Sequence, residues 1–291
     1  ASFIETLKAF FCGGIAGGFS RTVTAPLERL KVLYMTMYTD SKPPGIWVGL
    51  KDIYKKYGLI GLYRGNSVSI MMSVLEQALR FSIIDYSKKQ LQDKDGHLNP
   101  HDFLLIGVIT GILSTLVLFP LDVVRIRLLS SEGEKHKVYN KFVKIYNIAG
   151  IKGFYSGFIP HLISVLPAGS LNVVFYNLLR KVVITQNDIE NSRLHKFMFV
   201  GGSAALITGT VTYPLSLLTS RIIVANRNVS NIKDRIGSFT MIRTILRNEG
   251  FAGFFKGYNA SVLRLMIGQS VNFGTYEFLK SYISKSSKEK K

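Results

Sequence analysis

Three prolines recur at one fixed interval along this chain. Pro26, Pro120 and Pro214 are separated by 94 residues each time, and a leucine follows each of them. A period this long in a chain of 291 residues indicates three copies of one structural unit. We therefore expect repeats over residues 1–97, 98–190 and 191–291, integrated into a single domain.

Further landmarks recur in step with the prolines. Upstream, Gly13-x-x-x-Gly17 returns as Gly107-x-x-x-Gly111 and Gly201-x-x-x-Ala205. Downstream, each repeat carries a glycine-rich element that ends in an aromatic residue, one further residue and glycine, over residues 58–65, 150–157 and 250–257. Small residues four apart in an apolar segment let helices approach closely, and we favour this interpretation over a phosphate-binding loop.

The composition is both apolar and basic. Hydrophobic residues make up 47% of the chain, yet 37 Lys and Arg face 18 Asp and Glu, for a net charge of +19. The charges fall mostly between hydrophobic stretches, which is typical of a membrane protein with basic loops rather than of a nucleic-acid-binding protein. We expect no nucleic-acid partner. No secretory signal is evident, so we expect targeting information to be internal or to precede Ala1.

Each repeat contains two hydrophobic segments long enough to span a bilayer core of about 30 Å. The six predicted spans are Ile4–Met35, Ser67–Leu91, Phe103–Leu129, Phe158–Ile184, Phe197–Val224 and Tyr258–Ile283. Six spans place both termini on one side of the membrane. Between the two spans of a repeat, amphipathic patterns such as residues 46–54 predict a short helix at the interface.

Pro26 and Pro120 stand in motifs of the form P-x-[DE]-x-x-[KR], and Pro214 stands in a third copy that has lost both charges. Together with the glycine–aromatic elements that follow, this set resembles the mitochondrial carrier family. The resemblance covers essentially the whole chain. It implies an all-α membrane protein with six transmembrane helices in three pseudosymmetric repeats, and three short matrix-side helices. It also implies a multi-pass, monomeric transporter of the mitochondrial inner membrane, with no catalysis and no cofactor. Lipid partners, cardiolipin among them, are expected at matrix-side helix ends.

Proline removes a helical hydrogen bond, so Pro26, Pro120 and Pro214 are expected to kink three symmetry-related helices over a central path. The resemblance implies a matrix gate in which the acid of each motif pairs with the base of the next repeat. The gate residues are Glu28, Lys31, Asp122, Arg125, Ser216 and Thr219. Only Glu28 with Arg125 can form an ion pair, because Asp122 would face Thr219 and Lys31 would face Ser216. A solvent-reached pair contributes about 0–1 kcal/mol, so this loss should ease opening without breaking the fold.

A second network is predicted near the ends of the even-numbered spans. It consists of Asp85, Lys88, Asn177, Arg180, Glu277 and Lys280. The resemblance implies that these residues form a cytoplasmic gate. Asp85 could pair with Arg180 and Glu277 with Lys88, whereas Asn177 offers Lys280 only a hydrogen bond.

A solute without threefold symmetry must be recognised by positions that differ between repeats. Such positions on the inward faces include Arg21, Glu76, Arg80, Asn172, Arg264 and Asn272. Converging arginines favour an anion, because the guanidinium fork suits phosphate or carboxylate. Arg80 could instead simply pair with Glu76 one turn away, and we leave this open. For Arg21 and Arg264 we expect no nearby acid.

The resemblance narrows the solute to a nucleotide- or coenzyme A-like phosphorylated anion. Ser164 and Val165 occupy a contact point where nucleotide carriers have a glycine–aliphatic pair, and Arg264 falls on a basic contact point. Met72 departs from the pattern. The alternative is a degenerate carrier acting as a proton or anion leak, or as a membrane interaction protein. A single cysteine and five histidines without ligand spacing predict no metal site.

Overall fold

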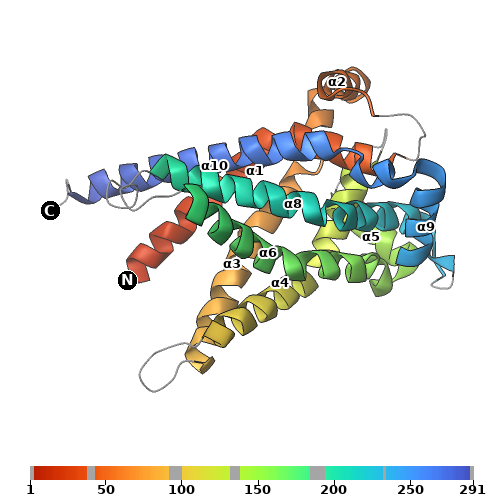
Figure 1. Ribbon diagram of the computed structural model, residues 1–291. Helices are drawn as coiled ribbons and strands as arrows, with labels where there is room; N and C mark the ends of the chain where they lie inside the picture. Colours follow the sequence, from red (N-terminus) through yellow and green to blue (C-terminus); the bar gives the residue numbers. More distant parts are fainter. Residues whose placement is uncertain are drawn as a thin grey trace.

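The computed structural model describes residues 3–37, 43–91, 100–131, 138–183, 194–231 and 234–288, and these residues are helical or in turns, without strands (Figure 1). The six long helices are α1 (Phe3–Thr36), α3 (Asn66–Leu91), α4 (Pro100–Leu129), α6 (Phe158–Val183), α8 (Leu194–Ala225) and α10 (Tyr258–Lys288). The predicted spans are confirmed as helices, with ends that differ by a few residues.

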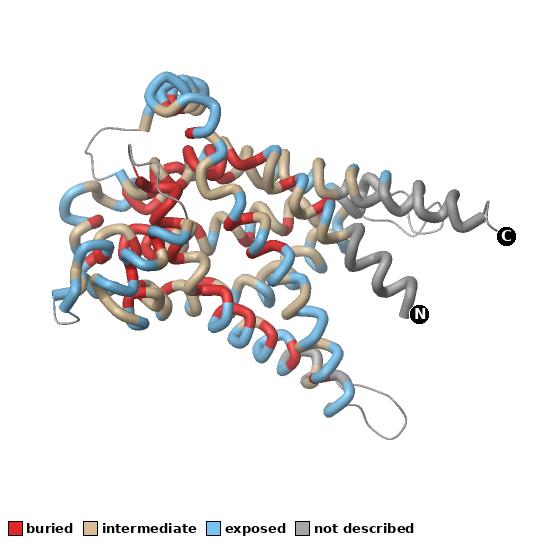
Figure 2. The backbone as a smooth tube through the Cα atoms, turned by 180° about the vertical axis from the view of Figure 1, so that it is seen from behind, coloured by how far each residue is buried: buried red, intermediate tan, exposed pale blue. Residues whose placement is uncertain are grey.

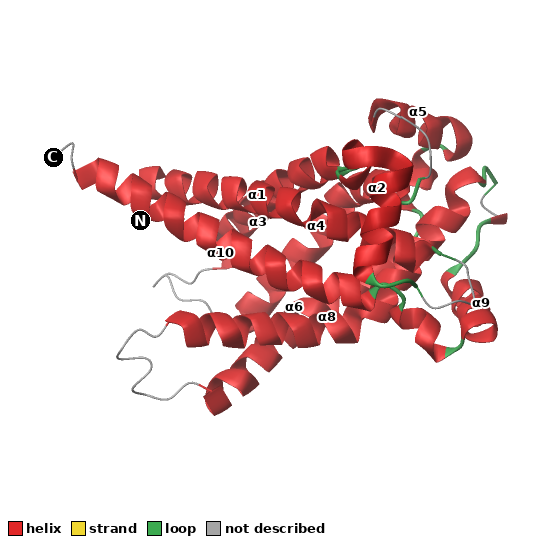
Figure 3. Cartoon of the chain, turned by 90° about the horizontal axis from the view of Figure 1, so that it is seen from above, coloured by secondary structure: helices red, strands yellow, loops and turns green. Residues whose placement is uncertain are grey.

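Three shorter helices follow the odd-numbered spans: α2 (Ile46–Leu62), α5 (Val138–Ala149) and α9 (Ser238–Glu249). α2 breaks at Gly58, and 3-10 turns η1 (Ile151–Tyr155) and η4 (Phe251–Phe255) continue α5 and α9; η2 (Asn226–Asn228) follows α8. Figures 1 and 3 place these short helices at the end of the bundle opposite the start of α1 and the end of α10. We call their end the matrix-side end.

The long helices form a closed ring. Each contacts the next in the order α1, α3, α4, α6, α8 and α10, and α10 returns to α1. α1, α4 and α8 also contact one another across the ring, and each contains one of the three repeat prolines. The helices therefore converge where the kink-forming motifs lie.

Among the residues that the structure describes, three helical segments are long and apolar enough to cross a membrane: Asn66–Leu91, Leu105–Leu129 and Ile151–Val183. α1 and α8 carry charged side chains that the bundle encloses, such as Glu28 at 4% exposure and Arg29 and Arg221 at 0%. Charge is tolerated at membrane depth where it faces the protein interior, so these side chains are compatible with membrane-spanning helices.

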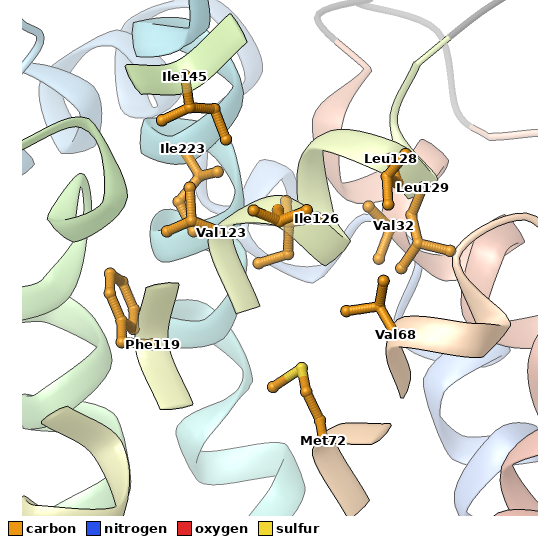
Figure 4. Close-up of a cluster of buried hydrophobic side chains, with 11 residues drawn as sticks. Val32, Val68, Met72, Phe119, Val123, Ile126, Leu128, Leu129, Ile145 and Ile223 are labelled. Carbon is orange, nitrogen blue, oxygen red and sulfur yellow. The ribbon is translucent and has the colours of Figure 1, made fainter. Parts of the chain in front are cut away.

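The hydrophobic core lies at the matrix-side end, where buried residues concentrate (Figure 2). One cluster there joins all three repeats through Val32, Val123, Ile145 and Ile223, among others (Figure 4). Met35, Leu129 and Ile223 occupy equivalent positions, nine residues after the proline of each repeat, and all three are fully buried. Apolar side chains thus pack at this position in each repeat.

The glycine–aromatic elements close the threefold arrangement. Gly65, Gly157 and Gly257 each adopt a positive φ, between 78° and 84°, that side-chain-bearing residues rarely accept. Each also lies against the first long helix of the next repeat: Gly65 near Leu129 of α4, Gly157 near Thr219 of α8, and Gly257 near Lys31 of α1. The backbone there turns sharply and approaches a neighbouring helix closely, so both requirements favour glycine.

Gly257→Ala should lower the melting temperature of the purified protein. A Cβ atom at this position would lie 3.0 Å from the Lys31 carbonyl oxygen, and φ is 81°. The strain is expected to cost about 1–3 kcal/mol. Gly169→Ala is the matched control, because its Cβ would meet nothing within 4 Å and its φ is not positive. Equal melting temperatures for the two variants in a thermal-unfolding assay would contradict this account.

Candidate functional site

A polar cavity of about 370 Å³ opens between α1, α3 and α10. Its lining includes five of the residues predicted to contact a solute: Arg21, Glu76, Arg80, Arg264 and Asn272. Ser20, Thr24, Ser73, Gln77 and Gln269 complete its polar surface. The cavity therefore draws on the first and third repeats.

One carboxylate serves two arginines in this cavity. Glu76 lies 3.0 Å from Arg80 on its own helix and 3.9 Å from Arg21 on α1. The pairing of Arg80 with Glu76, left open by the sequence, is present. The expectation that Arg21 has no nearby acid was wrong, because α1 and α3 pack side by side and bring Glu76 within reach.

Arg264 differs from the other two arginines. It is half-buried on α10, and its Nε has no hydrogen-bond partner among the described residues. Its repeat equivalent Met72 is 9% exposed and packs into the core cluster that contains Val68 (Figure 4). The departure from the family pattern at Met72 is thus explained by packing, and Arg264 is left with unused hydrogen-bonding capacity.

Three other predicted contact residues lie on α6 and do not line this cavity. Ser164 is buried, whereas Val165 and Asn172 are half-buried. Gln77 and Gln269, by contrast, line the cavity and were not predicted. The prediction followed one helical register in steps of four residues, whereas the lining of α3 and α10 spans neighbouring registers as well.

The matrix-side network centres on Arg125. Its guanidinium forms an ion pair with Glu28 of the preceding repeat and a second one, of 2.9 Å, with Asp122 on its own helix. The side chains of Glu28 and Arg125 are only 5% and 15% exposed. The expectation of solvent-reached pairs was therefore wrong for this one, and breaking a buried pair costs more than breaking an exposed pair.

The residues of the two pairs that cannot form, Lys31 with Ser216 and Asp122 with Thr219, make other contacts. The Lys31 ammonium lies over the Tyr213 ring, 5.7 Å from its centroid, and so interacts with the negative face of the aromatic ring. Thr219 donates a hydrogen bond to the Leu215 carbonyl within α8. Asp122, which lacks a base at position 219, uses Arg125 instead. Among the described residues, Glu28–Arg125 is the single inter-repeat ion pair of this network.

The predicted cytoplasmic-side network is not formed between Asp85 and Arg180. Asp85 pairs with Lys89 at 2.9 Å on its own helix, both side chains are about 70% exposed, and Asn177 and Arg180 are exposed on α6. The side chains of Lys88, Glu277 and Lys280 lie outside the described residues. Because Glu28 is paired with Arg125 whereas Asp85 is not paired with Arg180, the helices in this conformation are joined to one another at the matrix-side end.

A buried charge cluster in the third repeat was not predicted. Arg221 of α8 makes two hydrogen bonds, of 2.7 and 2.8 Å, to Glu249 at the end of α9, and Lys256 lies 2.7 Å from the same carboxylate. Burial acts to raise the pKa of Glu249, but hydrogen bonds from Arg221 and Lys256 outweigh it and lower that pKa below its usual value. The signal was present in the sequence: an acid precedes Gly250, where the other repeats have Tyr57 and Ala149.

A metal site is absent from the part of the chain that the structure describes, which contains no group of three or more His, Cys, Asp or Glu side chains.

Comparison with known proteins identifies one family across the chain. The family described as mitochondrial carrier protein matches residues 3–95, 96–187 and 190–287. The mitochondrial substrate carrier family protein C of Dictyostelium discoideum is 31% identical over all of this chain and 61% of its own length. A mitochondrial adenyl nucleotide antiporter of Danio rerio is 26% identical over 94% of this chain and 58% of its own length.

The adenine nucleotide transporter BT1 of Arabidopsis thaliana, described as chloroplastic or mitochondrial, is 28% identical over 98% of this chain and 72% of its own length. The chain thus spans between about half and three fifths of the length of the first three relatives.

Glu249→Gln should destabilise the protein markedly. The side chain of Arg221 is 0% exposed, so removing the carboxylate charge leaves a buried cation without its main counterion. We expect a loss of about 3 kcal/mol or more, read as a fall in melting temperature. Asp85→Asn is the matched control, because that pair is exposed and worth less than about 1 kcal/mol. A small and equal effect of both changes would refute the importance of the cluster.

Ser216→Asp should stabilise the conformation joined at the matrix-side end. Lys31 faces Tyr213, and Ser216 is half-buried one helical turn beyond that ring, so a carboxylate there would give Lys31 an ionic partner. Thr219 is 2% exposed and leaves no room for arginine, so the acid alone is the cleaner restoration. We expect a higher melting temperature, by the equivalent of about 1 kcal/mol or less, and slower solute uptake in liposomes. Ser216→Asn should change neither, and the same behaviour of Asp and Asn would count against a gating role.

Proposed function

Since the chain belongs to the mitochondrial carrier family, we propose that it exchanges an anionic, nucleotide- or coenzyme A-like phosphorylated solute across the mitochondrial inner membrane by alternating access. The observation that carries the proposal is the composition of the cavity between α1, α3 and α10. Among the described residues, its lining has three arginines and one glutamate, and the Nε of Arg264 has no hydrogen-bond partner.

The chemistry of the cavity suits a phosphate-bearing solute. Glu76 neutralises part of the charge of Arg21 and Arg80, so the cavity retains a net positive charge among its lining residues. Guanidinium groups bind phosphate oxygens in pairs, and serine and glutamine side chains can hydrogen-bond a ribose or base. The names of the relatives from Danio rerio and Arabidopsis thaliana, an adenyl nucleotide antiporter and an adenine nucleotide transporter, support the nucleotide class.

The same proposal assigns roles to the two charge networks. The Glu28–Arg125–Asp122 cluster would close the matrix side, and the residues around Asp85 and Arg180 would pair when the other side closes. The solute would then reach Arg21, Arg80 and Arg264 from the cytoplasmic side in the conformation seen here. We further propose a monomer of the inner membrane whose matrix-side helix ends contact lipid headgroups.

A leak or interaction protein is the alternative, and its support is the incomplete matrix-side network, with one inter-repeat ion pair. The alternative gives no reason for a half-buried arginine with an unpartnered Nε in a polar cavity. It also predicts that solute exchange is absent, so one assay separates the two.

Uptake of labelled ADP, ATP, coenzyme A, phosphate and dicarboxylates into liposomes tests the proposal. Exchange of a phosphorylated solute is expected, and Arg264→Ala should lower the transport rate at least tenfold through the loss of a charge-assisted hydrogen bond. Arg243→Ala, an exposed arginine on α9, is the matched control and should transport normally. No exchange above protein-free liposomes by the folded protein would overturn the proposal.

A further inference from the structure

A second and larger cavity, of about 720 Å³, lies at the matrix-side end of the bundle. Its walls come from the ends of α1 and α4, from α2 and α5, and from the segment that follows α8. Figure 3 shows α2 and α5 at this end, far from the starts of α1 and α8. The cavity is separate from the one that holds Arg264, and the two have no lining residue in common.

Basic side chains dominate the polar lining of this cavity. Among the described residues, one carboxylate, Asp52, faces five cations: Lys56, Arg127, Lys141, Lys144 and Arg227. The cations come from all three repeats, since Lys56 lies on α2, Lys144 on α5 and Arg227 on η2. An anion held among them would therefore contact three parts of the chain that are distant in sequence.

Arg127 is the residue that marks this cavity as a site rather than a basic surface. It is 6% exposed and uses one nitrogen, Nη1, to donate a 3.3 Å hydrogen bond to the Arg227 carbonyl. Its Nε and Nη2 are buried and have no hydrogen-bond partner among the described residues. The buried hydroxyl of Ser130, three residues further along the chain, also has no partner there. Unsatisfied buried donors on a charged group cost free energy, so a ligand that accepts these hydrogen bonds would bind favourably.

The third repeat shows what satisfies the equivalent arginine. Arg221, 94 positions after Arg127, has the Glu249 carboxylate against two of its nitrogens. The position that corresponds to Glu249 in the second repeat is Ala149, which offers no acceptor side chain. Arg127 therefore occupies the position of a paired arginine without the carboxylate.

We infer that this cavity binds a phosphate-bearing anion, which supplies Arg127 with the acceptor that the second repeat lacks. Lys141, Lys144 and Lys56 complete the charge that a diphosphate or triphosphate group requires, and Arg227 contributes from the third repeat. Because the ligand touches elements of all three repeats, it stabilises the conformation in which they meet at the matrix-side end. This inference does not depend on transport through the cavity between α1, α3 and α10, which we call the central cavity.

Titration calorimetry of the purified full chain with inorganic pyrophosphate tests the inference. The titration is carried out in the Arg264→Ala background, so that the central cavity contributes little. We expect binding in that background, weakened about tenfold by Arg127→Gln and about threefold by Lys144→Gln. Lys144 is exposed, so its change leaves the core intact if Arg127→Gln fails to fold. Lys51→Gln, an exposed lysine of α2 outside the cavity, is the matched control and should bind as the background does.

A second arm identifies the source of the phosphate. If micelles containing cardiolipin displace pyrophosphate and micelles of phosphatidylcholine do not, a lipid headgroup occupies the site. If neither does, the ligand is a free phosphorylated anion. Both outcomes support the site. Equal binding by the Arg127, Lys144 and Lys51 variants, or no pyrophosphate binding at all in the folded Arg264→Ala protein, would overturn it. If the protein with Arg264 intact exchanges no solute, while pyrophosphate still binds in the Arg264→Ala background, the proposed transport function fails and the matrix-side site stands.

Discussion

The ion pair between Glu28 and Arg125 is the interaction on which the matrix-side arrangement depends. It is buried, it joins the first repeat to the second, and Asp122 holds the same guanidinium from the other side. In a threefold design three such pairs would share the work. Here the other two positions are filled by a lysine over an aromatic ring and by a threonine bonded to its own helix. Electrostatic closure is therefore concentrated between two repeats.

Other interactions bring the third repeat into the closed end. Ile223 packs into the same cluster as Val32 and Val123 of the first two repeats, and Gly257 lies against the Lys31 backbone. Arg221 donates hydrogen bonds to the carbonyl oxygens of Met35 and Met37, at the end of α1. Packing and hydrogen bonds to backbone carbonyl groups thus join the third repeat to the first, whereas the Glu28–Arg125 ion pair joins the first to the second. In each of these contacts at least one partner is uncharged. They therefore hold the helices together without needing an acidic and a basic side chain at matching positions.

The sequence predicted the architecture well because the architecture repeats. A fixed period and apolar segments are local signals, and they located all six long helices to within a few residues. Pairings across the bundle were harder to predict. Glu76 reaches Arg21 only because α1 and α3 pack side by side, and no spacing in the sequence shows this. The Arg221–Glu249 pair was not predicted because both residues lie outside the P-x-[DE]-x-x-[KR] motif on which the predicted pairings rest. The contact of Lys31 with the Tyr213 ring was not predicted, because only an acidic residue at position 216 was considered as a partner for Lys31.

The order of features along α1 explains how the polar parts of the chain relate to one another. Residues from Gly17 to Thr24 line the central cavity, Glu28 and Lys31 belong to the charge network, and residues from Leu30 to Met37 line the matrix-side cavity. Because residues follow one another along a helix with a rise of about 1.5 Å each, the charge network lies between the central cavity and the matrix-side cavity along α1. The carboxylates of Glu28 and Asp122 are therefore the negative charges that separate two regions attractive to anions. An anion in either cavity meets cations of its own, and the joined side chains of Glu28, Asp122 and Arg125 lie between the two. In the proposed transport cycle, separating Glu28 from Arg125 would break the inter-repeat link and let the helices part in one step, which would couple solute passage to the rearrangement of the helices.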